Sequence, residues 1–143
     1  MLIVRGESRL GAEELLRRAM RKKIILLDAG KVGSVEELEL AHELAKKSIA
    51  DGTGISKNME IEFVLWLSGK KDIRRAFEEV GFDRRPDIWG GGQRGAGKEF
   101  VAVSFGMGKK EIIAELEMKE KKLGLGKEAG WEAVERISLG RIS

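Results

Sequence analysis

The sequence predicts a mixed α/β fold, with a small sheet of three to four strands covered by about six helices. Short apolar runs alternate along the 143 residues with stretches whose apolar residues recur at helical spacing. No apolar run approaches the roughly 18 residues that a membrane-spanning helix needs. A chain of this length can bury one ordinary core, so we expect a single domain over residues 1–143.

The first three expected elements are a strand, a helix and a strand. Residues 2–4 are apolar, and we expect Gly6 to end the strand that they begin. Residues 11–23 have apolar residues at helical spacing, with acidic residues early and basic residues late, as the helix dipole favours. Residues 24–27 form a continuous apolar tetrad before Gly30, which is typical of a buried strand.

Ser34 and Glu37 form an S-x-x-E capping box, which predicts the start of a helix with one apolar face. Residues 59–67 are ambiguous, because their first five residues alternate as in a strand while all nine together suit a buried helix. An amphipathic helix follows over residues 73–80, and we expect Gly81 to adopt the left-handed conformation at its end.

Residues 82–98 contain the only proline and five glycines, so we expect a mobile loop, with a basic, glycine-rich part at 83–98. Residues 100–105 predict a strand and residues 109–122 a helix. A last helix begins near Glu128 and is expected to pack Trp131, Val134 and Ile137.

The residue types present limit the kinds of reaction and metal site that this chain could support. The absence of cysteine excludes disulfides and thiol catalysis, and a lone histidine, His42, leaves any transition-metal site to carboxylates. We expect His42 at the surface or boundary of its helix, and Glu60 and Glu62 as solvated or edge carboxylates. We therefore expect no enzyme, no metal and no cofactor. The N-terminus lacks the pattern of a secretory signal, which favours a cytoplasmic protein, and the Lys- and Glu-rich composition leans toward a thermophile.

Residues 92–98, GQRGAGK, match the G-x-x-x-x-G-K pattern of a phosphate-binding loop. Their context disagrees, because such a loop leaves a buried strand and opens a helix, whereas here a strand is expected next. Glu99 also stands where a Ser or Thr would hold magnesium. A small nucleotide-binding enzyme that uses residues 92–98 is therefore the less favoured alternative to a flexible basic loop.

Basic residues concentrate in the middle of the chain, although the net charge is only +3. Residues 69–98 hold eight basic and five acidic residues. Cations placed near phosphates gain affinity by counterion release, although a solvated charged face is the commoner explanation for such a run. We expect Trp66 in the core, whereas Trp89 has no evident core role and is free to stack on a base.

Residues 56–82, SKNMEIEFVLWLSGKKDIRRAFEEVGF, and the following FVAVSF resemble the small KEOPS-complex subunit family (TPRKB, the PRPK-binding protein family), its archaeal members in particular. The order of elements up to AVERISLGRIS extends the likeness over most of the chain. The longer loop before residue 59 and the GGGQRGAGK segment depart from the family pattern. The matching positions are Met59, Glu60, Ile61, Ser68, Gly69, Ile73, Ala76 and Gly81.

The resemblance implies that residues 59–67 are helical, so that two helices broken at Ser68 and Gly69 pack on a small sheet. It implies a non-catalytic subunit of the complex that makes threonylcarbamoyladenosine in tRNA. Members of the family bind and support an atypical kinase/ATPase subunit, and archaeal members help recruit tRNA through its 3′ CCA end.

The resemblance gives the basic residues a specific role. The tRNA-binding residues are then expected to be Lys57, Lys70, Lys71, Arg74 and Arg75. A secondary basic group lies in the glycine-rich loop and consists of Arg84, Arg85, Arg94 and Lys98. Without a kinase partner, the same residues would suit a stand-alone basic RNA-binding module, which is the main alternative.

Overall fold

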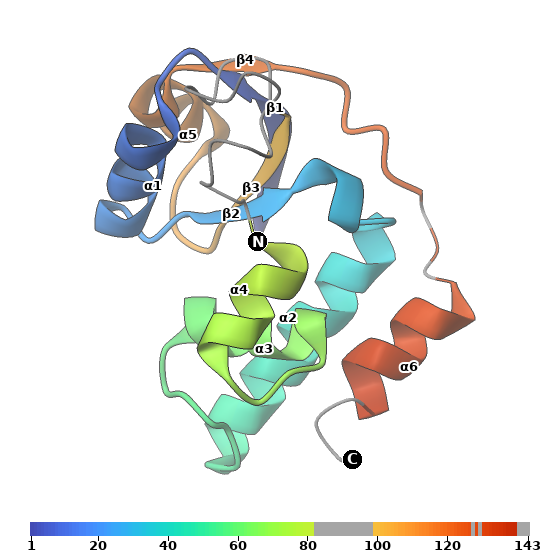
Figure 1. Ribbon diagram of the computed structural model, residues 1–143. Coiled ribbons are helices and arrows are strands. Elements are labelled where there is room, and N and C mark those ends of the chain that lie inside the picture. The colour runs from blue at the N-terminus through green and yellow to red at the C-terminus, as the bar shows by residue number, and fades with distance from the viewer. Residues whose placement is uncertain (82–98, 127, 129, 140–143) are drawn as a thin grey trace. The chain divides into compact units, whose positions relative to one another are not determined.

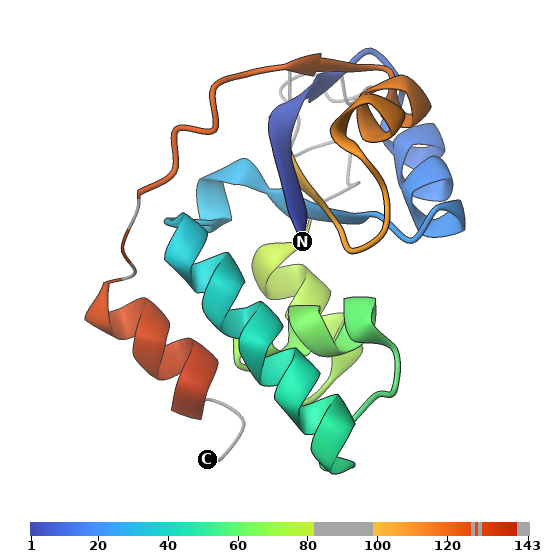
Figure 2. The same cartoon turned by 180° about the vertical axis from the view of Figure 1, so that it is seen from behind.

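The computed structural model describes residues 1–81, 99–126, 128 and 130–139 (Figures 1 and 2). These residues form six α-helices and a four-stranded antiparallel sheet, which confirms the mixed α/β class. The chain divides into two compact units, which are described separately. The first comprises Met1–Gly30 with Phe82–Gly124, and the second Lys31–Gly81 with Leu125–Ser143.

The first unit is a sheet with two helices against one of its faces (Figure 1). Its strands are β1 (Leu2–Ser8), β2 (Ile25–Asp28), β3 (Phe100–Ser104) and β4 (Met118–Glu120), in the order β2-β3-β1-β4. The two helices are α1 (Ala12–Arg21) and α5 (Lys109–Leu116). Between helices and sheet lies a core of Val4, Leu15, Ala19, Ile24, Leu26, Phe100, Ala102, Ile112, Leu116 and Met118.

Strand β1 runs through Gly6 instead of ending there, so the expected boundary is wrong. The cause is the close approach of β4, because the carbonyl group of Lys119 occupies the space that a Cβ on Gly6 would need. Glycine serves here as a site of close backbone packing rather than as a strand terminator.

Strand β4 lies within residues 109–122, where the sequence predicts an uninterrupted helix. Helix α5 ends at Leu116, and Glu117 adopts the left-handed conformation with φ 48°. The chain reverses at Glu117, so that Met118 pairs with Ser8 at the end of β1. A non-glycine residue in this conformation is uncommon, and the apolar periodicity of the sequence does not signal it.

The second unit consists of four helices: α2 (Val35–Asp51), α3 (Met59–Ser68), α4 (Ile73–Val80) and α6 (Trp131–Leu139). Both views show α6 running beside α2 (Figures 1 and 2). The Ser34 hydroxyl accepts a hydrogen bond from the Glu37 backbone N–H at 3.2 Å, so the expected cap is confirmed. The helical form of residues 59–67, which periodicity left open, is now established.

Two expectations for the second unit are wrong. Gly81 is extended, with φ −74° and ψ 162°, rather than left-handed, and a Cβ there would overlap the Phe77 carbonyl oxygen. Trp131 is 77% exposed, whereas Ile137 is fully buried. These two residues are six positions apart on α6, so they lie about 120° apart around the helix and cannot share one packed face.

In the described part of the chain, no helix combines the length and the apolar character needed to cross a membrane.

Candidate nucleic-acid interface

The break between α3 and α4 sets the position of the basic residues. Helix α3 ends at Gly69, whose φ of 71° is left-handed, and the Gly69 N–H donates to the Leu65 carbonyl at 3.0 Å. The buried Ser68 hydroxyl donates to Leu65 O at 3.1 Å and accepts from the Lys70 N–H at 3.2 Å. These bonds satisfy the last turn of α3 and fix the direction in which the chain leaves it.

Lys70 and Lys71 lie in the turn, and Arg74 and Arg75 follow in the first turn of α4. The Asp72 carboxylate caps α4 by accepting from the N–H groups of Arg74 at 2.8 Å and Arg75 at 3.4 Å. Because Asp72 already occupies these amides, the positive charge offered to a ligand resides on the four side chains.

All four basic residues are exposed. Arg74 forms an ion pair with Glu78 at 3.4 Å, but the two side chains are 87% and 65% exposed, so this pair contributes little to stability. Within the described part of the chain, the other three cations have no ion-pair partner. Phosphate groups would therefore meet exposed cations without first breaking a buried salt bridge.

Lys57 does not belong to this group. It precedes Asn58, the N-cap of α3, whereas Lys70 follows the other end of the same helix. The ten residues of α3, at 1.5 Å per residue, separate the two positions by roughly 15 Å. The structure thus brings four of the five predicted tRNA-binding residues together in one segment, which we name the 70–75 basic segment, and places the fifth at the opposite end of α3.

The remaining sequence-based candidates lie outside the described residues. They are Arg84, Arg85, Trp89, Arg94, Lys98 and the G-x-x-x-x-G-K match at 92–98.

The Glu62 carboxylate stabilises the local fold through hydrogen bonds. It is fully buried, so the expectation of a solvated or edge carboxylate is wrong for this residue. Its oxygens accept from the N–H groups of Ile55 and Ser56, both at 3.1 Å, and from the Ser48 hydroxyl at 2.5 Å. These bonds hold the loop that carries Lys57 against α2 and α3.

Trp66 completes the Glu62 site. Its indole N–H donates to Glu62 Oε2 at 3.0 Å and to Ser48 Oγ at 3.1 Å, and its ring is half-buried rather than fully in the core. Because its N–H takes part in this network, the Trp66 indole helps to fix the structure around Glu62. The only signal in the sequence was the i, i+4 spacing of Glu62 and Trp66 along a helix.

Arg136 links α6 to the helices that frame the basic segment, and sequence reasoning missed it. Its guanidinium donates to Glu37 Oε1 at 2.9 Å and to the Leu67 carbonyl at 3.2 Å. The Ser34 hydroxyl donates to the other Glu37 oxygen at 2.9 Å. Arg136 and Glu37 are 99 residues apart in sequence, so no local pattern signals the pair.

His42 is half-buried at the boundary of α2, as expected. Burial, reinforced by the charge of Lys46, holds the pKa of His42 below its ordinary value, so the ring is neutral at neutral pH. Residues 1–81, 99–126, 128 and 130–139 contain no cluster of three or more His, Asp and Glu side chains placed to bind a metal ion.

No protein-family model matches this chain, and no curated protein matches it either. The case for a nucleic-acid interface therefore rests on the residues themselves. Four exposed cations lie within six positions, directly after the break between α3 and α4, and clustered positive charge of this kind attracts phosphate groups.

Proposed function

We propose that the protein is a non-catalytic, cytoplasmic accessory subunit of the KEOPS complex, which binds the atypical kinase/ATPase subunit and recruits tRNA through its 3′ CCA end. One observation carries the proposal. The segment that resembles the family forms two helices, α3 and α4, with the break at Ser68 and Gly69 that the resemblance implies, and exposed cations follow directly.

In this proposal, the 70–75 basic segment contacts tRNA phosphates. Arg74 and Arg75 offer planar guanidinium groups that can bind two phosphate oxygens at once, while Lys70 and Lys71 act as compact charges. Phosphate contacts position the nucleic acid without reading its sequence, whereas an unpaired CCA end is recognised by stacking and by contacts to base edges. The segment therefore supplies affinity, and Lys57 supplies a separate contact at the far end of α3.

The kinase contact needs exposed apolar side chains. Ile73 is 43% exposed and Phe77 is 41% exposed, and their i, i+4 spacing makes them a continuous ridge on α4. We assign the kinase contact to this ridge. Arg75 lies about 160° from Phe77 around the helix, so it is on the side of α4 away from this ridge, whereas Arg74 lies only about 60° from Phe77 and borders the ridge.

Co-purification with the kinase/ATPase subunit, with and without tRNA, tests the proposal. We expect the two proteins to co-purify without tRNA. The double variant Ile73→Ser with Phe77→Ser should lose the kinase subunit and retain tRNA binding. Reversing the charges of the basic segment should have the opposite effect. If wild-type protein retains neither partner, the proposed function is wrong.

The stand-alone RNA-binding module is the second candidate, because the same exposed cations favour it. It predicts that tRNA binds as tightly to the isolated protein as to a mixture with the kinase subunit. It also predicts that the kinase subunit does not co-purify with the protein, even at salt concentrations at which the protein binds tRNA.

A further inference from the structure

Strand β4 forms one edge of the sheet in the first unit, and among the described residues it pairs only with β1. The Lys121 N–H donates to the Arg5 carbonyl at 2.8 Å. Because hydrogen-bonded and non-bonded pairs alternate in an antiparallel ladder, Lys119 and Glu7 form the next bonded pair. The backbone N–H and C=O groups of Met118 and Glu120 therefore point away from β1, toward the side of β4 on which the described residues place no strand.

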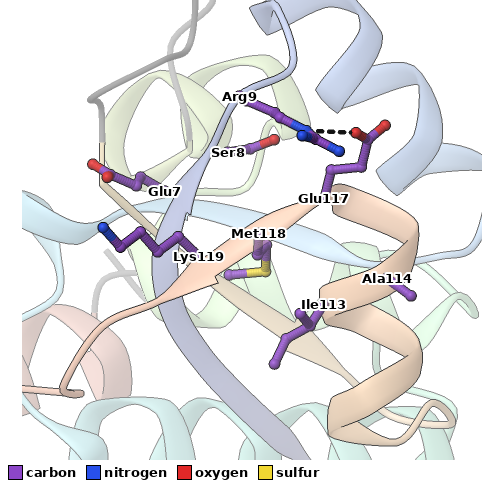
Figure 3. Close-up of a pocket in the computed structure, with 8 residues that line it drawn as sticks. All are labelled: Glu7, Ser8, Arg9, Ile113, Ala114, Glu117, Met118 and Lys119. Atoms are coloured by element: carbon purple, nitrogen blue, oxygen red, sulfur yellow. Dashed lines mark hydrogen bonds and ion pairs between the residues drawn. The ribbon is translucent and has the colours of Figure 1, made fainter.

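A cavity of about 580 Å³ lies beside this edge, between β4, α5 and the end of β1 (Figure 3). Its volume is in the range of ordinary ligand sites. Ile113 of α5 and Met118 of β4 give it an apolar floor, while Arg9 and Glu117 meet at one end at 2.8 Å. We name this cavity the β4–α5 groove.

The residues that line the groove differ in chemical character between the two faces of the sheet. Met118 belongs to the apolar core on the face that α5 covers. Lys119, the next residue, points to the opposite face, beside Glu7 (Figure 3). Lys119 is exposed, and the described residues give it no ion-pair partner. The edge thus combines outward backbone groups, an apolar floor and a cation.

We propose that the β4–α5 groove binds an extended peptide segment of a partner protein, which adds to β4 as a further strand. Main-chain hydrogen bonds to Met118 and Glu120 would supply affinity, as in other cases of strand addition. Alternate side chains of a strand point to opposite faces, so an apolar residue would contact Ile113 and Met118 while its acidic neighbour reaches Lys119. The ligand is therefore a segment in which apolar and acidic residues alternate.

A second copy of this chain is a poorer occupant. Two β4 strands paired antiparallel about their centres would place Lys119 directly opposite Lys119, and like charges in that position destabilise a sheet. Charged residues on a short edge strand are also a common protection against self-association. This inference concerns the first unit alone and does not depend on the proposed function.

Fluorescence anisotropy with a labelled hexapeptide of alternating valine and aspartate tests the proposal on the full chain. We expect saturable binding, which Lys119→Glu weakens about fivefold or more and which Ile113→Glu abolishes. Lys122→Glu makes the same charge change outside the groove and should alter binding less than about twofold. A matched probe with lysine in place of aspartate should bind more weakly than the aspartate probe.

Amide hydrogen exchange supplies a readout that does not depend on charge. Bound peptide should slow exchange at Met118 and Glu120, and should change Lys119 little because its N–H is already directed at β1. Equal binding of the lysine probe, or unchanged exchange at Met118 and Glu120, would overturn the proposal. Self-association of the free protein that protects the same two amides would assign the edge to a second copy instead.

Discussion

The backbone of Arg136 in α6 lies directly against Gly69 at the end of α3. The Arg136 carbonyl group occupies the space that a Cβ on Gly69 would need, and Gly69 also has the left-handed φ of 71°. Steric packing and backbone conformation thus demand glycine at the same position. The Ser-Gly break that carries much of the family resemblance is therefore fixed by the packing of the second unit.

Alanine substitutions at Gly69 and at Gly52 together separate the steric effect from the effect of backbone conformation. Gly52 has nearly the same φ, 72°, but a Cβ there would meet no atom within 4 Å. We expect Gly52→Ala to cost about 1 kcal/mol, the conformational term alone, and Gly69→Ala to cost about 3 kcal/mol or more. Urea unfolding of the two variants measures the difference. Equal losses of unfolding free energy would show that the contact between α6 and Gly69 adds no steric cost.

The buried carboxylate of Glu62 gives a second prediction. Glu62→Gln replaces one oxygen by an NH₂ group, which cannot accept hydrogen bonds. The variant therefore loses either the bonds that Ser48 and Trp66 donate to one oxygen or the bonds that the two loop amides donate to the other. We expect a loss of about 2–4 kcal/mol in unfolding free energy. Glu60→Gln is the control and should change stability by no more than about 0.5 kcal/mol. A similar effect of both variants would contradict the buried network.

Acidic pH should destabilise the first unit through its arginine-paired carboxylates. The hydrogen bond from Arg9 holds the pKa of Glu117 below its ordinary 4.5, and the hydrogen bond from Arg18 does the same for the pKa of Glu14. A carboxyl group whose folded-state pKa is lowered contributes stability above its unfolded pKa. It loses that contribution as the pH falls through the folded pKa. The stability should therefore decline below about pH 4.5.

Glu117→Gln tests this pH dependence and retains a side chain of similar size. The variant should be less stable than wild type at pH 7, and the gap should narrow as the pH falls from 4.5 to 3. Thermal unfolding at a series of pH values measures both trends. A gap that stays constant over this range would assign the loss to packing or to the strained backbone at Glu117 rather than to its charge.

Lys57 should act independently of the 70–75 basic segment, because α3 separates them by roughly 15 Å, more than the Debye length at physiological salt. We expect Lys57→Glu to reduce tRNA affinity less than Arg75→Glu does. The double variant should show the sum of the two changes in binding free energy. Filter binding at one salt concentration is sufficient. Strong coupling between the two changes would mean that one phosphate contacts both residues.

Much of the fold could be predicted because the spacing of apolar residues indicates which side of a helix or strand is buried. The Ser34 cap, the strand from Ile25 and the helix from Ile73 all followed from local patterns. Strand β4 could not be predicted in this way. Its existence depends on the left-handed Glu117, whose carboxylate binds Arg9 and Arg18 from distant parts of the chain.

The candidate site was predictable only in part. The sequence places Lys70 and Arg75 near each other because they flank one helix start, and a local pattern is sufficient for that. It groups Lys57 with them because Lys57 is close to them in the sequence, and that proximity does not show that the two ends of α3 lie apart. The burial of Glu62 and the pairing of Arg136 with Glu37 arise from tertiary contacts, which periodicity does not encode.

The salt dependence of tRNA binding tests the central claim most directly. The test variant reverses Lys70, Lys71, Arg74 and Arg75 to Glu, and the control reverses Lys22, Lys47, Lys110 and Lys122, which are also exposed. Glutamate in the first turn of α4 favours the helix dipole but repels Glu78 and Glu79 at i, i+4, so the helix content of the test variant is compared with that of wild type. We expect the slope of log K against log salt to fall by up to about 3 in the test variant and by less than about 1 in the control. Equal slopes for wild type and test variant would contradict the assignment of the basic segment to tRNA.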